Sequence, residues 1–276
     1  MKRILFINPP VVCVNECQMG WYSYAHPTSI LKLIAWNRLQ GNEVAFIDCM
    51  DYQGGSIPGN AVKLQGSMAY TQPGDASPTP AYSLQPYKKL PLGSNRLNLC
   101  IDTFILGKPS HWLEDELEKQ APPDEIWVSC HMTFNNELVH ETIRAAKRIF
   151  PKAIILLGGN YATLFPQEAE QKSGATVFKG LFPGAAELFP DYSLFRGHLD
   201  YMVFQLDLGC NNNCSHCVNS LLHQEIVRMD VPSLVEDLKR KKEQYGVSCF
   251  VNIDPNVACF DLTDFLQTCI NRKLNA

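Results

Sequence analysis

The sequence predicts an α/β protein that begins with an open parallel sheet and continues into a second, shorter α/β unit. Short apolar runs recur along the chain, as at Ile4–Ile7 and Val44–Ile47, and a segment with helical periodicity separates these two. Strand, helix, glycine and strand in this order are typical of a parallel sheet whose crossovers are helices. After about residue 200 the same alternation of strand and helix begins again.

The first unit is predicted to contain five strands with helices between them. The strands are expected at residues 4–8, 44–47, 125–130, 153–157 and 176–179. The helices are expected at residues 28–40, 112–119, 135–150 and 166–171. Gly41 is placed to end the first helix, and Asn135 or Asn136 can cap the third with its side chain. Together these elements predict one domain over residues 1–185.

Residues 52–110 interrupt the regular alternation. They are rich in Gly, Pro, Ser and Gln and contain no clear periodic segment. A connection this long within a domain is either disordered or functional. We therefore interpret residues 52–110 as an insertion at the ligand-binding edge of the sheet.

The second unit follows a segment, residues 186–200, that is expected to be a linker. Its predicted elements are a strand at 201–208, a helix at 232–245, a strand at 247–253 and a helix at 263–274. Two such strand-helix units cannot close a barrel, which needs about eight strands. Residues 201–276 are thus predicted to be the N-terminal part of an incomplete barrel domain.

Composition excludes several classes of function. The net charge of −4 and the pI near 6.0 provide no basic surface for nucleic acid. No apolar run approaches the ~18 residues that a membrane span needs, and Asn8-Pro9-Pro10 cuts short the apolar run that follows Met1. Several of the 11 cysteines lie in strand-like runs, so we expect reduced thiols in a cytoplasmic protein.

The most informative motif is a cysteine loop, Cys210-x3-Cys214-x2-Cys217, directly after the predicted strand at 201–208. One short loop can wrap three thiolates around a metal centre and leave a position open for chemistry. Zinc, with His216 or His223 as a fourth ligand, and a trio of free thiols are alternatives. An iron–sulfur cluster is favoured because the loop follows the first strand of a strand-helix series, at the edge where barrel enzymes carry their sites.

This cysteine loop resembles the signature of the radical S-adenosylmethionine (SAM) superfamily, and residues 235–254 resemble the first helix and second strand of its barrel. The resemblance implies that Cys210, Cys214 and Cys217 bind a 4Fe–4S cluster, to which SAM binds. It implies reductive cleavage of SAM to a 5′-deoxyadenosyl radical, with electrons from an external donor such as flavodoxin or ferredoxin. His216, in place of the usual aromatic residue, and Asp254 are expected near SAM.

The first unit is similar to the Rossmann-like cobalamin-binding domain that precedes the barrel in one large subgroup of that superfamily. Glycines at the end of a strand allow the backbone to approach a flat corrin in the crevice outside the strand ends. The motif D-x-H-x-x-G is absent, which implies a corrin without a protein histidine on cobalt. The residues expected to contact cobalamin are Asn8, Pro9, Pro10, Met132, Thr133, Gly158, Gly159, Tyr161, Ala162 and Thr163.

These resemblances predict a cobalamin-dependent radical SAM enzyme that catalyses methyl transfer or related radical chemistry on a substrate that the sequence leaves open. Further SAM-binding elements are expected C-terminal to Ala276, on the same or another chain. One alternative is a corrin- or metal-binding module with an incomplete barrel and no turnover. Another is a radical SAM methylthiotransferase that binds an extra cluster through Cys13, Cys49 and Cys100.

Overall fold

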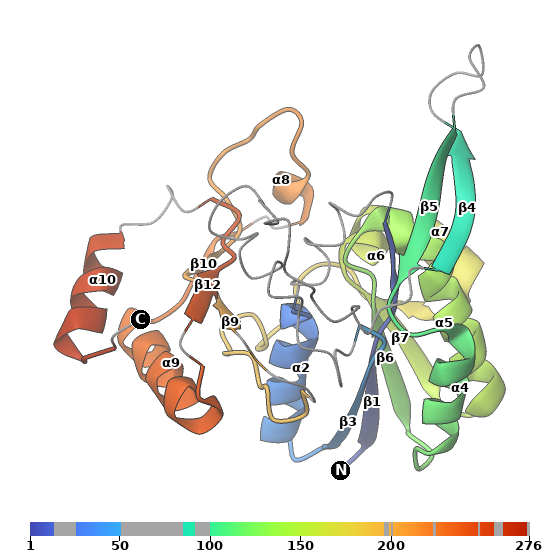
Figure 1. Cartoon of the computed structure of the whole chain (residues 1–276), viewed down its shortest axis with the longest axis horizontal. Helices are drawn as coiled ribbons and strands as arrows, with labels where there is room; N and C mark the ends of the chain where they lie inside the picture. The colour runs from blue at the N-terminus through green and yellow to red at the C-terminus, as the bar shows by residue number, and fades with distance from the viewer. Residues whose placement is uncertain are drawn as a thin grey trace, which may run out of the picture.

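A parallel sheet of five strands forms the centre of the first unit in the computed structural model (Figure 1). The structure describes residues 1–13, 26–50, 85–91, 100–195, 199, 201–222, 225–247, 249–256 and 262–274. The strand order is β3-β1-β6-β7-β8, and every pair is parallel. The strands are β1 (Arg3–Asn8), β3 (Glu43–Asp48), β6 (Glu125–Ser129), β7 (Ile154–Gly158) and β8 (Thr176–Val177). The predicted open parallel sheet, consistent with a Rossmann-like fold, is thus confirmed.

Helices cover both faces of this sheet, as Figure 1 shows. The helices of this unit are α2 (Thr28–Leu39), α4 (Ser110–Glu118), α5 (Asn136–Ile149), α6 (Asn160–Leu164) and α7 (Pro166–Ser173). Side chains alternate along β1 because successive residues of a strand point to opposite faces. Ile4 and Phe6 therefore pack with α2, whereas Leu5 and Ile7 pack with α4 and α5. Burial on both faces explains why the strands are continuously apolar.

The start of α5 differs from the prediction. Asn135 occupies the N-cap position, but its side chain makes no capping hydrogen bond. Its Oδ1 instead accepts a hydrogen bond of 2.8 Å from the backbone N–H of Val12, a residue of β2 (Val11–Cys13). The Asn135 side chain is thus used to hold the chain just after β1. The short helices α6 and η1 (Thr133–Asn135) were not predicted.

The predicted insertion contains regular structure of its own. Strands β4 (Gln85–Pro91) and β5 (Cys100–Leu106) form an antiparallel sheet with β2 in the order β2-β5-β4. Because β2 follows β1 after only two residues, this small sheet starts from the carboxyl edge of the central sheet. Residues 51–84 and 92–99 lie outside the described residues, and residues 107–109 lead from β5 to α4.

The second unit is built on a parallel pair, β9 (Tyr201–Phe204) and β12 (Cys249–Asn252). The predicted strand at 201–208 ends early, and β10 (Asp207–Leu208) pairs antiparallel with β11 (Val227–Arg228). The helices of this unit are α8 (Asn219–Leu222), α9 (Val231–Tyr245) and α10 (Leu262–Asn271). No helix among the described residues is long and apolar enough to cross a membrane.

The two units share an apolar core. Side chains of β1 and α2 are buried together with Tyr201, Met202 and Val203 of β9 and with Tyr192 of the preceding segment. Tyr192, 1% exposed, accepts a hydrogen bond of 3.1 Å from the N–H of Val203, and its hydroxyl lies 2.9 Å from Nδ1 of His26. The His26 ring in turn stacks on Tyr201 with 4.5 Å between ring centres. Residues 186–200 therefore include a buried polar junction.

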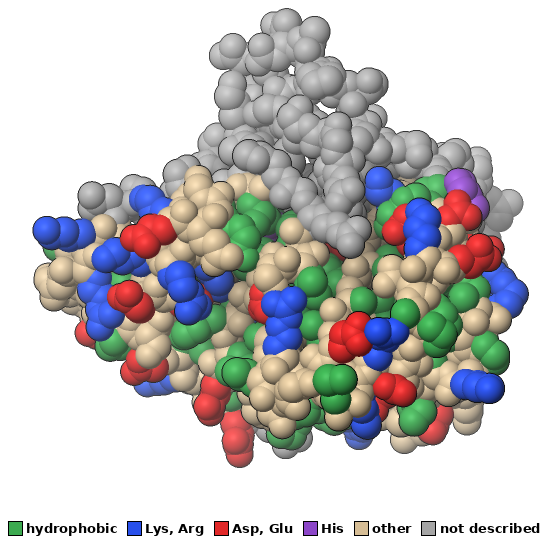
Figure 2. Space-filling view, turned by 90° about the horizontal axis from the view of Figure 1, so that it is seen from below, with side chains coloured by type: hydrophobic (Ala, Val, Ile, Leu, Met, Phe, Trp, Pro, Cys, Tyr) green, Lys and Arg blue, Asp and Glu red, His purple; other side chains and the backbone are tan. Residues whose placement is uncertain are grey.

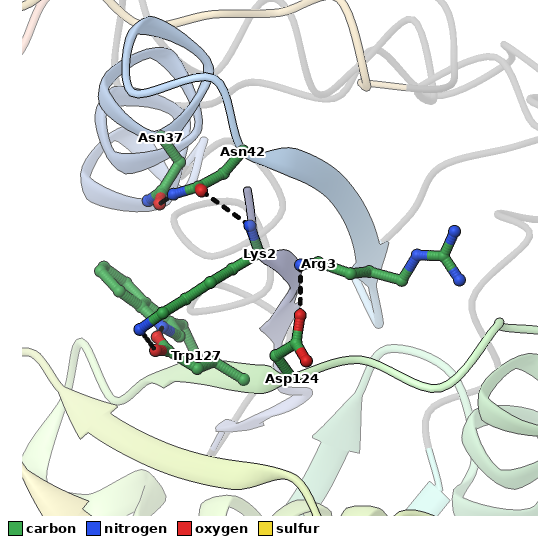
Figure 3. A network of polar contacts seen from close by, with 7 residues as sticks. Lys2, Arg3, Asn37, Asn42, Asp124 and Trp127 are labelled. Carbon is green, nitrogen blue, oxygen red and sulfur yellow. Dashed lines mark hydrogen bonds and ion pairs between the residues drawn. The ribbon is translucent and has the colours of Figure 1, made fainter.

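The amino ends of the strands are fastened by a separate polar network (Figure 3). Nζ of Lys2 lies 2.5 Å from Oε1 of Glu125, and the indole N–H of Trp127 donates a 2.8 Å hydrogen bond to the other oxygen of that carboxylate. The backbone N–H of Arg3 donates to Asp124 at 2.7 Å. These contacts fix the edge of the sheet opposite to the strand carboxyl ends, so they stabilise the domain without taking part in the site.

We expect Tyr192→Phe to destabilise the protein by about 1–3 kcal/mol, because it leaves the buried N–H of Val203 without a partner. Urea unfolding followed by circular dichroism measures the change. Tyr245→Phe is the matched control, since this ring packs against the same core and no described residue hydrogen-bonds its hydroxyl. Equal effects of the two substitutions would contradict the role given to the Tyr192 hydroxyl.

Burial lowers the pKa of His26 from its ordinary value of 6.5 to about 4. The unfolded chain therefore binds a proton below pH 6.5 that the folded chain does not, and stability is lost as the pH falls from 6.5 towards 4. We expect wild type to lose on the order of 2–3 kcal/mol more than His26→Phe between pH 7 and pH 4.5. Urea unfolding at the two pH values tests this, and parallel losses in both proteins would refute it.

Candidate functional site

The carboxyl ends of the central strands place several predicted site residues at one edge. Asn8 lies opposite Asp48 in the β1–β3 register, and Ser129 lies opposite Gly158 in the β6–β7 register. Nδ2 of Asn8 donates a 2.7 Å hydrogen bond to Oδ1 of Asp48, which also accepts from the backbone N–H of Met50 at 2.9 Å. This edge is where open α/β sheets bind their ligands.

The turn after β7 requires glycine at its second position. Gly159 has φ +94°, and a Cβ there would lie 2.6 Å from the carbonyl oxygen of Cys130. The close approach joins the turns after β6 and β7, and the Cys130 N–H donates to the carbonyl of Gly158 at 2.9 Å. By contrast, no described atom lies within 4 Å of a Cβ built on Gly158. Among the described residues nothing fills the space beside Gly158, as a backbone that cradles a flat ligand requires.

Three residues of α6, the helix that follows this turn, differ in their surroundings. The side chains of Tyr161 and Ala162 are buried, 1% and 0% exposed, in the core between the sheet and α5. Any contact of these two with a corrin would therefore come from the backbone. Thr163 is half-buried; its hydroxyl donates to the carbonyl of Gly159 at 2.9 Å and accepts from the N–H of Gly180 at 3.0 Å. Thr163 thus ties α6 to the segment after β8.

The remaining residues predicted to contact cobalamin lie in the loops after β1 and β6. Pro9 is buried, whereas Pro10, Met132 and Thr133 are half-buried. The carbonyl of Met132 accepts a hydrogen bond from the Cys130 thiol at 3.2 Å. Sequence order and register thus bring the predicted cobalamin residues to one edge of the sheet, with Tyr161 and Ala162 turned into the core.

Two further thiols are buried beneath this edge. Cys49 and Cys130 are each 1% exposed, and both belong to the core under the strand ends. Burial raises the pKa of the Cys130 thiol to about 12 and that of Cys49 still further. Both are neutral thiols that pack as small apolar groups. A buried Cys49 does not suit the extra-cluster alternative. Cys13 ends β2 and Cys100 begins β5, and the side chains of these two cysteines lie outside the described part of the structure.

The cysteine loop runs from β10 to α8 on the second unit. Gly209, with φ +101°, turns the chain into it. Cys214 is exposed, Cys210 and Cys217 are half-buried, and none is in a disulfide. The loop makes a turn of its own, since the N–H of Cys217 donates to the carbonyl of Cys214 at 3.0 Å. Three accessible thiols on eight residues are thus available as ligands.

The three thiols do not converge as ligands of one ion. No group of three His, Cys, Asp or Glu side chains among the described residues is arranged to hold a single metal ion. An iron–sulfur cubane takes each thiolate on a different iron, so its ligands stand farther apart than those of one ion. Thiolates are donors that both iron–sulfur clusters and zinc use, so the kind of donor does not choose between the two centres. His223 lies outside the described residues.

The two residues predicted to lie near SAM have contrasting surroundings. His216 is exposed on the cysteine loop. Asp254 lies after β12, where Oδ1 accepts from the N–H groups of Leu206 at 2.9 Å and Asp207 at 3.2 Å. Its Oδ2 accepts from Nδ2 of Asn252 at 3.0 Å. Asp254 thus holds the chain that leads from β9 into the cysteine loop, and its contact with SAM stays a prediction.

Asp207 is a buried carboxyl group in β10, the short strand that leads into the cysteine loop. It is 2% exposed, and neither oxygen has a hydrogen-bond partner in the described part of the chain. Its nearest cation is Nε of Arg228, at 3.8 Å. Burial raises the pKa of Asp207, the Arg228 guanidinium opposes this, and Asp254 adds to it. The start of the cysteine loop therefore has two carboxyl groups close together, and the surroundings of Asp207 favour its neutral form.

The two predicted sites lie side by side. Helix α6, which begins directly after Gly159, contacts α8, which begins two residues after Cys217. Figure 1 shows α8 and the cysteine loop above the carboxyl ends of the central strands, on the same side as α6. Tertiary folding therefore brings the Gly158-Gly159 turn and the cysteine loop to one region of the molecule, although about 50 residues separate them.

A cavity elsewhere on the second unit is less suited to a charged ligand. It measures about 610 Å³ and lies beside α9. Its lining balances three cations, Lys239, Arg240 and Arg272, with three anions, Glu236, Asp237 and Glu243. Figure 2 shows blue and red side chains intermixed at this end of the molecule. The charges largely pair with one another, as in the ion pair of Arg272 with Glu236 at 3.0 Å.

Several residues that shape these sites were not found from the sequence. Asn135, Asp207 and Asn256 gain their roles from contacts with distant segments. An Asn or Asp at a strand end is common in turns, so its identity alone does not separate a turn residue from one that holds a loop.

The comparison with protein families supports the first site. Residues 101–189 match the B12 binding domain family. The matched stretch runs from β5 to beyond β8, and it contains Met132, Thr133 and the Gly158-Gly159 turn. Cobalamin binding by this part of the chain fits the match. No curated protein matches the chain.

We expect the two adjacent glycines to respond oppositely to alanine. Gly159→Ala should cost about 1–3 kcal/mol or more of unfolding free energy, because a positive φ and the Cys130 carbonyl both oppose a Cβ. Gly158→Ala should change stability by less than about 1 kcal/mol, since its Cβ meets no described atom. Urea unfolding measures both. A larger loss for Gly158→Ala would overturn this account of the turn.

Proposed function

We propose that the chain is a radical SAM protein that holds cobalamin at the carboxyl edge of the first sheet and a 4Fe–4S cluster on the cysteine loop. The observation that carries the proposal is the contact between α6 and α8. It brings the turn that suits a corrin next to the loop that carries three accessible thiols. Two cofactors that act on one substrate must be held close together, and a corrin and a cluster at these two places would be neighbours.

The cobalamin part rests on chemistry and on the family match. Gly158 leaves space at the strand end, and the match to the B12 binding domain covers this turn. Backbone groups of residues 158–163, with Met132 and Thr133 and with Asn8, Pro9 and Pro10, would line the corrin. A bound corrin supplies a carrier for methyl groups. The chain's own part would be to hold the corrin at this edge of the sheet and to exclude water from it.

The cluster part rests on the donor set. Cys210, Cys214 and Cys217 offer three thiolates within one loop, which leaves one iron open for SAM. A cluster bound there supplies the electron for reductive cleavage of SAM. The loop's exposure would let an external donor such as flavodoxin or ferredoxin approach. The proposed reaction is methyl transfer or related radical chemistry.

We further propose that residues 201–276 are the first two strand-helix units of a barrel. The parallel pairing of β9 with β12, followed by α9 and α10, supports this arrangement. Within the described residues each of these strands pairs in parallel on one edge only. Additional units, on the same or another chain, would supply SAM and substrate contacts. The first sheet over residues 1–185 and the segment 186–200 complete the proposed domain plan.

A second candidate is a cobalamin-binding module without turnover. The match to the B12 binding domain favours it, because this match covers residues 101–189 and does not extend to the cysteine loop. In that case the three thiols would bind another metal or none. The two candidates differ in the metal content of the cysteine loop and in its response to SAM.

Anaerobic reconstitution with ferrous iron and sulfide tests the proposal. We expect about four irons and four sulfides per chain and, after reduction with dithionite, an electron paramagnetic resonance signal that changes when SAM is added. Cys214→Ala should abolish the cluster, because a ligand is lost. Cys249→Ala, at another exposed thiol outside the loop, should keep it. Cobalamin retention is measured in the same samples by absorbance.

The outcomes separate the candidates. Stoichiometric zinc without iron would refute the radical SAM proposal. If that sample also retained cobalamin, the result would support the second candidate, a cobalamin-binding module without turnover. A cluster that persists in Cys214→Ala would refute the ligand assignment. Loss of cobalamin in Gly158→Leu at unchanged unfolding midpoint would support the corrin position, and full retention would contradict it.

A further inference from the structure

Among the three thiols of the cysteine loop, Cys210 stands out by its hydrogen bonds. Its Sγ accepts from the backbone N–H of Asn212 at 3.4 Å and from Nδ2 of Asn256 at 3.7 Å. Among the described residues, no comparable donor reaches the sulfur of Cys214 or Cys217. The Asn256 contact joins residues that are 46 positions apart, so it depends on the tertiary fold.

Asn256 belongs to the same short segment as Asp254. Asp254 holds Leu206 and Asp207, at the stem of the cysteine loop, through two backbone N–H groups. Asn256 then reaches the first cysteine of the loop. The segment after β12 thus makes two contacts with this region. Asp254 binds the backbone just before the cysteine loop, and Asn256 binds the sulfur of Cys210.

Charged side chains lie close to the start of the cysteine loop. Asp207 and Asp254 lie at the stem of the loop, and Arg228, the cation nearest Asp207, is largely exposed with 62% of its side chain accessible. A thiolate-bound centre gains negative charge when it is reduced. An N–H group aimed at the sulfur stabilises that added charge, because hydrogen bonds to the sulfurs stabilise the reduced form of iron–sulfur clusters.

We propose that Asn256 is a positioning residue that holds the sulfur of Cys210 and raises the reduction potential of the metal centre bound there. The inference rests on the proposed function, since it requires a redox-active centre on the cysteine loop. Asn256 acts through Cys210 and does not itself touch the metal. Its amide donates to the sulfur in both oxidation states, and more strongly when the one added electron increases the negative charge on the sulfur.

The midpoint potential of the reconstituted cluster tests the role of Asn256. The potential is measured anaerobically on the full chain by dithionite titration with paramagnetic resonance detection. Asn256→Leu removes the donor and should lower the potential. We expect about a tenfold shift in the ratio of oxidised to reduced cluster, the effect of one hydrogen bond to a charged group, which equals ~59 mV for a one-electron couple. Asn256→Asp, which places an anion there, should lower it further.

Asn212→Ala is the matched control. It removes a side-chain amide from the same loop but keeps the backbone N–H that donates to Cys210, so its potential should equal that of wild type. A cluster of unchanged potential in both Asn256 variants would overturn the inference while leaving the proposed function intact. If Asn256→Leu does not fold, the potential of Asn256→Asp tests the inference instead. A wild-type chain that forms no cluster would overturn the proposed function and this inference with it.

Discussion

The shared apolar core between the central sheet and the second unit is the interaction on which the rest depends. One face of β1, the buried side of α2 and strand β9 exclude water together, and Tyr192 satisfies the one backbone N–H of β9 that it meets there. Each apolar side chain buried in this way contributes about 1.5–3 kcal/mol. Because this shared core fixes the second unit against the first, it also fixes the cysteine loop relative to the carboxyl edge of the sheet.

Short polar contacts then fix the positions of the glycine turn and the cysteine loop within the arrangement that the apolar core sets. At the first site the Cys130 carbonyl approaches Gly159 closely and so joins the turns after β6 and β7. At the second site Asp254 and Asn256 hold the stem and the first cysteine of the loop. Both sets of contacts lie where strands end, because parallel strands present their free backbone groups and their connecting loops at a common edge.

The helix contact between α6 and α8 connects these two supports. Helix α6 begins directly after the Gly158-Gly159 turn and α8 begins two residues after Cys217, so this contact places the turn next to the end of the cysteine loop. A short separation suits the proposed chemistry, in which two cofactors share one substrate.

The sequence by itself determined the parallel strands, most of the helices and the cysteine motif, because apolar periodicity and cysteine spacing are local properties of the chain. Strands β1, β3, β6 and β7 lie within one or two residues of their predicted positions. Only the tertiary structure decided that Tyr161 turns into the core, that Asn135 serves Val12 and that Asn256 reaches Cys210. These roles depend on which distant segments meet, and burial and hydrogen-bond partners are settled by packing across the whole chain.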